Sequence, residues 1–143
     1  MKNQLVLECR DAQHAIQVIQ DELSRRGKAA VIAVADAHGE LMALLRMDGA
    51  PYSSITVATN KAFSAAREGK PSREIGQKMR DAKKGYAIAY YGDNRFTGFP
   101  GGLPVIVEGQ VVGAVGVSGL SGAEDEELAQ IGVTAILSGY KSE

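Results

Sequence analysis

The stretch that most constrains the fold is Phe96–Gly122, which holds eight of the chain's 17 glycines. It runs as a glycine-rich loop, an apolar strand, a short turn, a second strand and the entry to a helix. This order predicts an antiparallel β-hairpin. Glycine inside a strand is typical of a bulge or of the close approach of a ligand or another backbone. We therefore expect a surface bare of side chains beside this hairpin.

Two causes could explain such a bare surface. Gly101 and Gly102 precede the first strand, and Gly113, Gly116 and Gly119 are spaced three apart along the second. One cause is the close packing of a helix or a second subunit, and the other is a flat ligand. The pattern is not the dinucleotide-binding fingerprint, which needs G-x-G-x-x-G with a helix opening directly after the first strand.

The rest of the chain predicts further helices and one more pair of strands. Apolar residues at helical spacing alternate with short apolar runs bounded by turn residues. The expected helices cover residues 11–26, 53–68, 73–83 and 123–138, and the expected strands 29–35 and 40–47; residues 85–91 fit either state. The helix over 53–68 buries mostly alanine, so it must lie close to its neighbour. Antiparallel strands with intervening helices indicate an α+β fold.

The last helix carries two distinctive signals at its start and along its length. Ser121 and Glu124 have the S-x-x-E spacing of a capping box, and residues 124–127 place negative charge in the first turn. The apolar arc of residues 123–138 is wider than one packing surface needs. We therefore expect this helix to contact both the sheet and a second subunit.

Composition narrows the class of protein. A chain of 143 residues fits a single domain over residues 1–143. The formal net charge of −1 argues against a nucleic-acid partner and is compatible with self-association. A lone cysteine, Cys9, excludes an intrachain disulfide, and no apolar run approaches the ~18 residues that cross a bilayer. We expect a cytoplasmic protein with no membrane partner.

The two histidines are the first candidates for chemistry. His14 points away from the apolar stripe of the first helix, so it is either a solvated side chain or a ligand to a metal or haem iron. A subunit interface is one place for such a ligand. His38 lies in the turn at Asp36–Gly39, where a turn role is favoured.

Charged and aromatic residues are the second group. Arg46 and Asp48 could pair with each other or hold a carboxylate-bearing ligand, and Lys61 could be solvated or bind a carboxylate. Five aromatic residues between positions 86 and 99 could line a pocket for a planar ligand or form the core of their segment; they are Tyr86, Tyr90, Tyr91, Phe96 and Phe99. No nucleophile has a neighbouring base, so no catalytic residue is assigned.

A set of motifs together resembles the GlcG/HbpS family, whose members are labelled haem-degrading or haem-binding and include the C-terminal domain of PduO-type proteins. The motifs are D-x-x-G-x-L and R-M-D-G-A within 36–50, K-A at 61–62, G-G-x-P at 101–104, and G-A-V-G-V-S-G with D-E-x-x-A within 113–129. The resemblance spans residues 5–139, and the segment YYGDNRFTGFPGGLP is closer to the GlcG branch.

The resemblance implies a profilin-like fold, an antiparallel sheet flanked by helices on both sides. It also implies self-association into a homodimer or octamer and a small-molecule ligand. The first hypothesis is a cytosolic protein that binds haem or a related tetrapyrrole. His14 would be the axial metal ligand, and Phe99, Gly101 and Gly102 would form part of the wall.

Two alternatives remain open. The chain could be an enzyme or accessory protein acting on a small hydroxy or carboxylic acid, as in glycolate-type metabolism. Arg46 and Lys61 would then hold the anionic ligand. The chain could also be a structural assembly module with no ligand. Whether it is an enzyme stays undecided.

Overall fold

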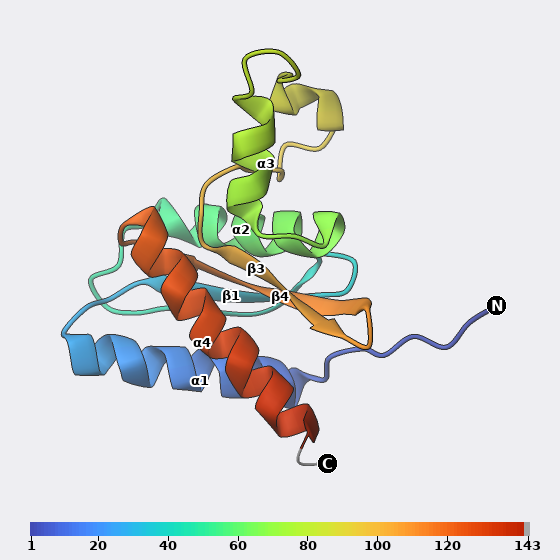
Figure 1. Ribbon diagram of the computed structural model, residues 1–143. Coiled ribbons are helices and arrows are strands. Elements are labelled where there is room, and N and C mark those ends of the chain that lie inside the picture. The colour runs from blue at the N-terminus through green and yellow to red at the C-terminus, as the bar shows by residue number, and fades with distance from the viewer. Residues whose placement is uncertain (142–143) are drawn as a thin grey trace.

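A four-stranded antiparallel sheet forms the centre of the computed structural model, which describes residues 1–141. The strands follow the order β2-β1-β4-β3 (Figure 1). Their bounds are β1 Val31–Asp36, β2 Leu41–Arg46, β3 Gly102–Val107 and β4 Gln110–Ser118. The helices are α1 Cys9–Arg26, α2 Ser54–Glu68, α3 Ser72–Met79 and α4 Gly122–Lys141, with a short 3₁₀ turn, η1, at Ile88–Tyr91. Within residues 1–141, no helix combines the length and apolar character needed to cross a membrane.

Both predicted hairpins are present. In the first, the Asp36 carboxylate accepts hydrogen bonds from the backbone N–H groups of His38 and Glu40, which closes the turn. The turn role favoured for His38 is thus confirmed. In the second, β3 and β4 pair with a register shift between Val105 and Ile106. Both hairpins could be predicted from the sequence because each turn is formed by residues that are close together in the chain.

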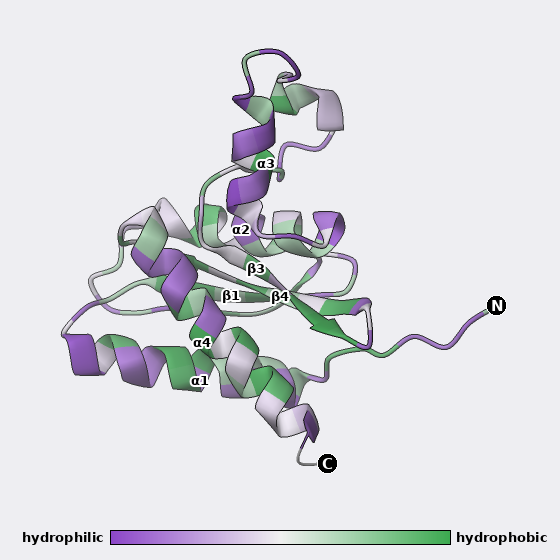
Figure 2. Cartoon of the chain, viewed as in Figure 1, coloured by the Kyte–Doolittle hydropathy of each residue, from purple (hydrophilic) through white to green (hydrophobic). Residues whose placement is uncertain are grey.

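The sheet has helices on both faces, as the family resemblance implies. Helix α2 covers one face, and α1 and α4 lie side by side on the other (Figure 1). Apolar residues gather on the strands and on the helix sides that face them (Figure 2). The fold is therefore α+β with three layers.

Close contact between α2 and the sheet explains two of the bare glycines, Gly116 of β4 and Gly102 of β3. A Cβ atom at Gly116 would overlap the Ala58 carbonyl oxygen and the Ala62 nitrogen of α2. Gly102, directly opposite Gly116 in the register, lies equally close to the Lys61 carbonyl group. Of the two causes considered for these glycines, helix packing is the one observed. The prediction that the alanine-rich helix lies close to its neighbour is confirmed.

Helix α4 finds its second packing surface within the same chain. Its buried residues include Leu128, Val133 and Ile136, and it lies against β3 and β4 on one side and α1 on the other. The half-buried side chains Ile131 and Leu137 pack on the same core. Two packing surfaces within the same chain therefore explain the wide apolar arc, and a contact of this helix with a second subunit stays a prediction.

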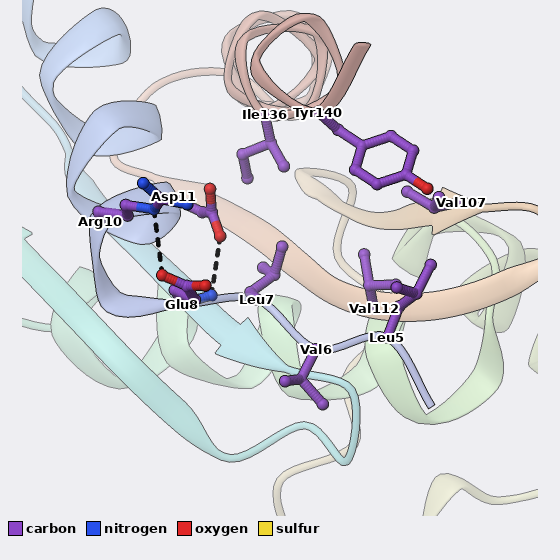
Figure 3. A pocket seen from close by; sticks show the side chains of 10 residues that line it. All are labelled: Leu5, Val6, Leu7, Glu8, Arg10, Asp11, Val107, Val112, Ile136 and Tyr140. Atoms are coloured by element: carbon purple, nitrogen blue, oxygen red, sulfur yellow. Dashed lines mark hydrogen bonds and ion pairs between the residues drawn. The ribbon is translucent and has the colours of Figure 1, made fainter. Parts of the chain in front are cut away.

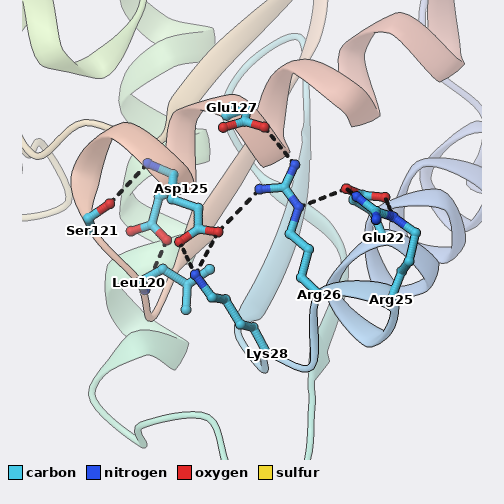
Figure 4. A network of polar contacts seen from close by, with 9 residues as sticks. Glu22, Arg25, Arg26, Lys28, Leu120, Ser121, Asp125 and Glu127 are labelled. Carbon is cyan, nitrogen blue, oxygen red and sulfur yellow. Dashed lines mark hydrogen bonds and ion pairs between the residues drawn. The ribbon is translucent and has the colours of Figure 1, made fainter.

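An arginine joins the end of α1 to the start of α4. The Arg26 guanidinium lies 2.7 Å from Glu22, 3.2 Å from Glu124 and 2.6 Å from Glu127 (Figure 4). Ser121 caps α4 through the Glu124 N–H at 3.2 Å, as expected. The Glu124 carboxylate, however, binds Lys28 and Arg26, so the reciprocal half of the predicted capping box is replaced by these ion pairs.

Residues 70–92 project from the α2 side of the sheet, and we call this segment the lobe (Figure 1). Its helix α3 ends at Met79, earlier than the predicted residue 83, because Asp81 instead caps a turn through the N–H groups of Lys83 and Lys84. The ambiguous residues 85–91 resolve into the short η1 turn.

We expect Gly116→Ala to destabilise the fold by about 1–3 kcal/mol, because the added methyl would push α2 off the sheet. Urea unfolding monitored by circular dichroism measures this loss. Gly139→Ala is the matched control, since a Cβ there meets nothing within 4 Å. Equal stability of the Gly116 variant and the wild type would contradict the close packing.

We also expect the Arg26 cluster to make stability depend on acid pH. Hydrogen bonds from Arg25 and Arg26 lower the pKa of Glu22 from 4.5 to about 2. A carboxyl with a depressed folded pKa stabilises the fold above its unfolded value of 4.5, and this contribution is lost as pH falls towards 2. The melting temperature of Glu22→Gln should therefore lie below that of the wild type at pH 7, and the gap should close between pH 4.5 and 2.5. Asp48→Asn, which removes an exposed carboxylate with no ion pair among residues 1–141, should show no such convergence.

Candidate functional site

A cleft of about 330 Å³ opens at the end of the sheet where α2 and α4 both begin. We call it the α2–α4 cleft. Its lining comes from three separate segments of the chain, residues 53–61, 99–100 and 118–125. The lining residues are Ser53, Ser54, Val57, Lys61, Phe99, Pro100, Ser118, Leu120, Gly122 and Asp125.

The floor of the cleft is a buried ion pair. Lys61 Nζ lies 3.0 Å from Asp125 Oδ2, and the two side chains are only 4% and 3% exposed. Lys61 also donates to the Val117 carbonyl oxygen at 2.8 Å, and the Leu120 N–H donates to Asp125 Oδ1 at 3.0 Å. The pair thereby links α2, the end of β4 and α4.

This pairing changes the role expected for Lys61. Burial lowers the pKa of Lys61, because desolvation penalises the ammonium group more than Asp125 stabilises it. The side chain is not solvated, and its charge is already matched by a carboxylate of the same chain. Asp125 was not identified from the sequence, where it stands among three other acidic residues. Asp125 lies 64 residues after Lys61 in the chain, and only the fold brings the two side chains into contact.

Two glycines let the loop before β3 pass over this ion pair. Gly101 has φ +126°, and a Cβ there would come within 2.8 Å of Lys61 Nζ and 2.6 Å of the Val117 oxygen. A larger residue at this position would be strained and would displace the lysine. The G-G motif is therefore needed to build the floor of the cleft, and it presents no open glycine surface to a ligand there.

The rim of the cleft is partly apolar. Phe99 is 62% exposed and is the aromatic side chain that the cleft-lining residues contribute. Ser72 Oγ donates to the Phe99 carbonyl oxygen at 2.6 Å and accepts from the Gly102 N–H at 2.9 Å, which fixes the loop. On the opposite wall, the hydroxyl groups of Ser118 and Ser54 are hydrogen-bonded at 3.1 Å.

Arg46 lies near the cleft on the same face of the sheet. It pairs with Val31, which in turn pairs with Ser118, so Arg46 and Ser118 are two strands, about 10 Å, apart. The guanidinium lies 4.9 Å from the centre of the exposed Tyr52 ring. The predicted pairing with Asp48 is absent from the ion pairs of residues 1–141, because β2 ends at Arg46 and Asp48 falls in the following turn.

His14 is the predicted site residue that lies elsewhere. It is exposed on α1, and α1 packs on the face of the sheet opposite α2. Five of the six predicted residues therefore gather at one end of the α2 face, and His14 does not join them. Within the described part of the chain, no three His, Cys, Asp or Glu side chains are grouped as a metal ion would require.

Most of the predicted aromatic group forms its own small core. Tyr91 stacks on Phe96 at 4.3 Å between ring centres, and the hydroxyl groups of Tyr86 and Tyr91 are 3.0 Å apart. Phe96 also meets Phe63 edge-on at 5.0 Å. These rings hold the lobe against α2, so of the group Phe99 is the one that lines the cleft.

A second hollow, of about 180 Å³, lies between the N-terminal segment and the end of α4 (Figure 3). Its walls are mostly aliphatic and include Leu5, Val107 and Ile136. None of the six predicted site residues lines it. The α2–α4 cleft is therefore the better candidate for the site.

Comparison with known proteins places residues 7–134 under a family model described as "Haem degrading protein HbpS-like". Protein GlcG of Escherichia coli K12 is 32% identical over 118 residues, covering 82% of this chain and 85% of its own. The crystal structure of Klebsiella pneumoniae protein ORFY superposes with a TM-score of 0.88 at 30% identity, over 96% of this chain and 95% of that one. A crystal structure entitled PduOC:Heme Complex has a TM-score of 0.84 over 92% and 95% of the chains, and at 23% identity it shows a shared fold.

We expect Lys61→Met to cost about 3–5 kcal/mol of folding stability, because it leaves the Asp125 carboxylate buried without its cation. Asp125→Asn should partly relieve this loss when combined with it, so the two changes should be strongly non-additive in urea unfolding. Lys28→Met, which removes an ion pair whose lysine is 45% exposed, is the matched control and should cost less than about 1 kcal/mol. Additive losses in the double variant would argue against a coupled pair.

Proposed function

This chain belongs to the HbpS-like family, as its motifs predict, and we propose that it binds haem or a related tetrapyrrole between two copies of itself. One copy would contribute the α2–α4 cleft, and the other would contribute His14 of α1. The observation that carries the proposal is the position of these two elements on opposite faces of a single chain.

The choice of ligand class rests on the relatives. The family model is named for haem degradation, and a protein of the same fold has been crystallised as a haem complex. Neither finding identifies the residues that would hold haem in this chain. Those residues have to be inferred from the chemistry of the cleft.

The cleft is suited to the planar ring and to the carboxylate groups of such a ligand. Phe99, Pro100 and Leu120 offer apolar surface to a planar ring. The hydroxyl groups of Ser53 and Ser54 and the nearby guanidinium of Arg46 are suited to the propionate groups. Bound haem would supply the iron chemistry, and these side chains would hold and orient it.

The cleft does not fit the iron. Its lining includes no His, Cys, Met or Tyr, and the one amine, that of Lys61, is engaged by Asp125. An axial ligand would therefore come from outside the cleft. His14 is exposed and available for this role, but only to a ligand that contacts the α1 face.

A contact between opposite faces of two copies has a consequence for assembly. Such a head-to-tail contact produces a ring where the rotation closes and a filament where it does not. A twofold dimer uses the same face of both copies, so of the dimer and octamer implied by the family resemblance the octamer fits this contact, and we propose a ring. In the α2–α4 cleft, Asp125 already neutralises the charge of Lys61. The alternative ligand, a small carboxylic acid held by Arg46 and Lys61, is therefore less favoured.

We expect hemin to give a saturable Soret band with the wild-type protein. His14→Ala and Phe99→Ala should each weaken hemin binding by about tenfold or more, since one removes the iron ligand and the other an aromatic contact. His38→Ala and Tyr90→Ala are matched controls, because both side chains are exposed but lie outside the cleft.

Mixing the two defective variants tests the shared site directly. In an equimolar mixture, about one site in four pairs an intact cleft with an intact His14, whatever the symmetry of the assembly. Hemin binding should recover to about a quarter of the wild-type capacity. A mixture as defective as its components would show that the site is not shared between copies.

A further inference from the structure

The two edges of the sheet are built differently. In the order β2-β1-β4-β3, the strands β2 and β3 each have a neighbouring strand on one side only among residues 1–141. An edge strand exposes backbone N–H and C=O groups that can pair with another strand, and proteins commonly block such an edge with a proline, a charge or a bulge. The sequence of each edge therefore indicates whether it is blocked.

The β3 edge is blocked in its middle. Just before β3, the Gly101 carbonyl oxygen accepts a hydrogen bond from the Val117 N–H at 3.0 Å. Because bonded and non-bonded pairs alternate along antiparallel strands, the backbone of Pro104 is turned away from β4, to the outer side. Proline has no N–H to offer there, and a register shift follows between Val105 and Ile106. A further strand would find no regular row of partners on β3.

The β2 edge carries no such block. The Met47 N–H donates to the Ala30 oxygen at 3.2 Å, so Met47 is a bonded partner of the chain leading into β1. By the same alternation, Leu44 and Arg46 turn their N–H and C=O groups to the outer side of the sheet. Residues 41–45, which read LMALL, include no proline and no charged side chain.

The side chains of β2 are also left partly uncovered. Residues 42–45 are half-buried, whereas the first five residues of the neighbouring β1 are buried. Hollows of about 500 and 320 Å³ lie beside the end of β2, and Tyr52, which is 77% exposed, stands next to Arg46 there. The register shift with β1 affects residues 41–42 and leaves residues 43–46 regular. β2 thus combines outward backbone groups with apolar side chains that the helices of its own chain do not fully cover.

We propose that β2 pairs with β2 of a second copy, antiparallel about a twofold axis beside Leu44. Leu44 would face Leu44 of the second copy, and Met42 would face Arg46, so the two strands overlap along most of their length. The outward N–H and C=O groups of each strand would bond those of the other. The two four-stranded sheets would then continue as one, with both α2 helices on the same face.

A second copy is favoured over an extended segment of another protein because β2 is complementary to itself. Its apolar side chains belong to the cores on the two faces of the sheet, and those of a second copy would extend both. The charge within the strand, that of Arg46, meets Met42 rather than itself. Glu40, just before the strand, is already held by Arg95 at 3.0 Å.

This contact is independent of the one proposed for haem. It joins the same edge of both copies, whereas the haem proposal joins the α2–α4 cleft of one copy to α1 of another. The two contacts are compatible, because rings formed through one can be joined in pairs through the other.

Sedimentation velocity of the protein without hemin tests the pairing. Leu44→Lys and Leu44→Glu each place like charges opposite one another, so each variant should associate about tenfold more weakly than the wild type, or less. An equimolar mixture of the two should recover association, because a lysine then faces a glutamate. Ile106→Lys and Ile106→Glu change an exposed side chain on the β3 edge, and these matched controls should associate like the wild type.

Leu41→Lys decides the question where the Leu44 variants lose their native circular dichroism. Leu41 is 48% exposed and Ile106 is 44% exposed, so a lysine at either position costs the fold little. Only Leu41→Lys should weaken association. Amide hydrogen exchange gives a readout of the backbone itself, because the Leu44 N–H should exchange slowly in the associated wild type and rapidly in Leu41→Lys.

Four results would each overturn the pairing. These are a wild-type monomer, Leu44 variants that associate like the wild type, a mixture that does not recover, and an equal loss of association in Ile106→Lys. None of these measurements contains hemin, and none of the variants changes His14 or Phe99. The hemin titration and the pairing of β2 are therefore judged separately.

Discussion

The buried contact between Lys61 and Asp125 is the interaction on which the candidate site depends. Removing two charges from water is costly, and the fold offsets that cost by satisfying their remaining hydrogen-bonding groups with the Val117 oxygen and the Leu120 N–H. The same bonds set the distance between α2, β4 and α4. Gly101 and Gly102 then close over the lysine without side chains of their own. The position of the Phe99 rim follows from this arrangement.

Much of the fold could be predicted because its signals are local. The turn at Asp36 and the alanine face of α2 each depend on residues close together in the chain. The contact of Lys61 with Asp125 could not be predicted from the sequence. It joins residues that are 64 apart, and Asp125 is one of four consecutive acidic residues. The buried face of α4 was predicted, but its neighbour on the second side, α1, is a matter of topology that a single helical pattern does not contain.

The candidate site residues show the same division. Residue type and local position selected Arg46, Phe99 and the glycine pair, and these gather at one end of the α2 face. The same reasoning selected His14, which the fold carries to the other face. Sequence spacing identifies the face of a helix that a side chain occupies, but not the face of the sheet on which that helix packs. That separation is the reason for proposing a site shared between two copies.

The single hydroxyl of Ser72 has a mechanical consequence. It holds the carbonyl of Phe99 and the N–H of Gly102, and it is also the first residue of α3. The start of α3 and the loop that carries the cleft rim are therefore joined at one residue. Loss of this hydroxyl would free both ends of the loop, so the order of the Phe99 rim depends on a residue that does not itself line the cleft.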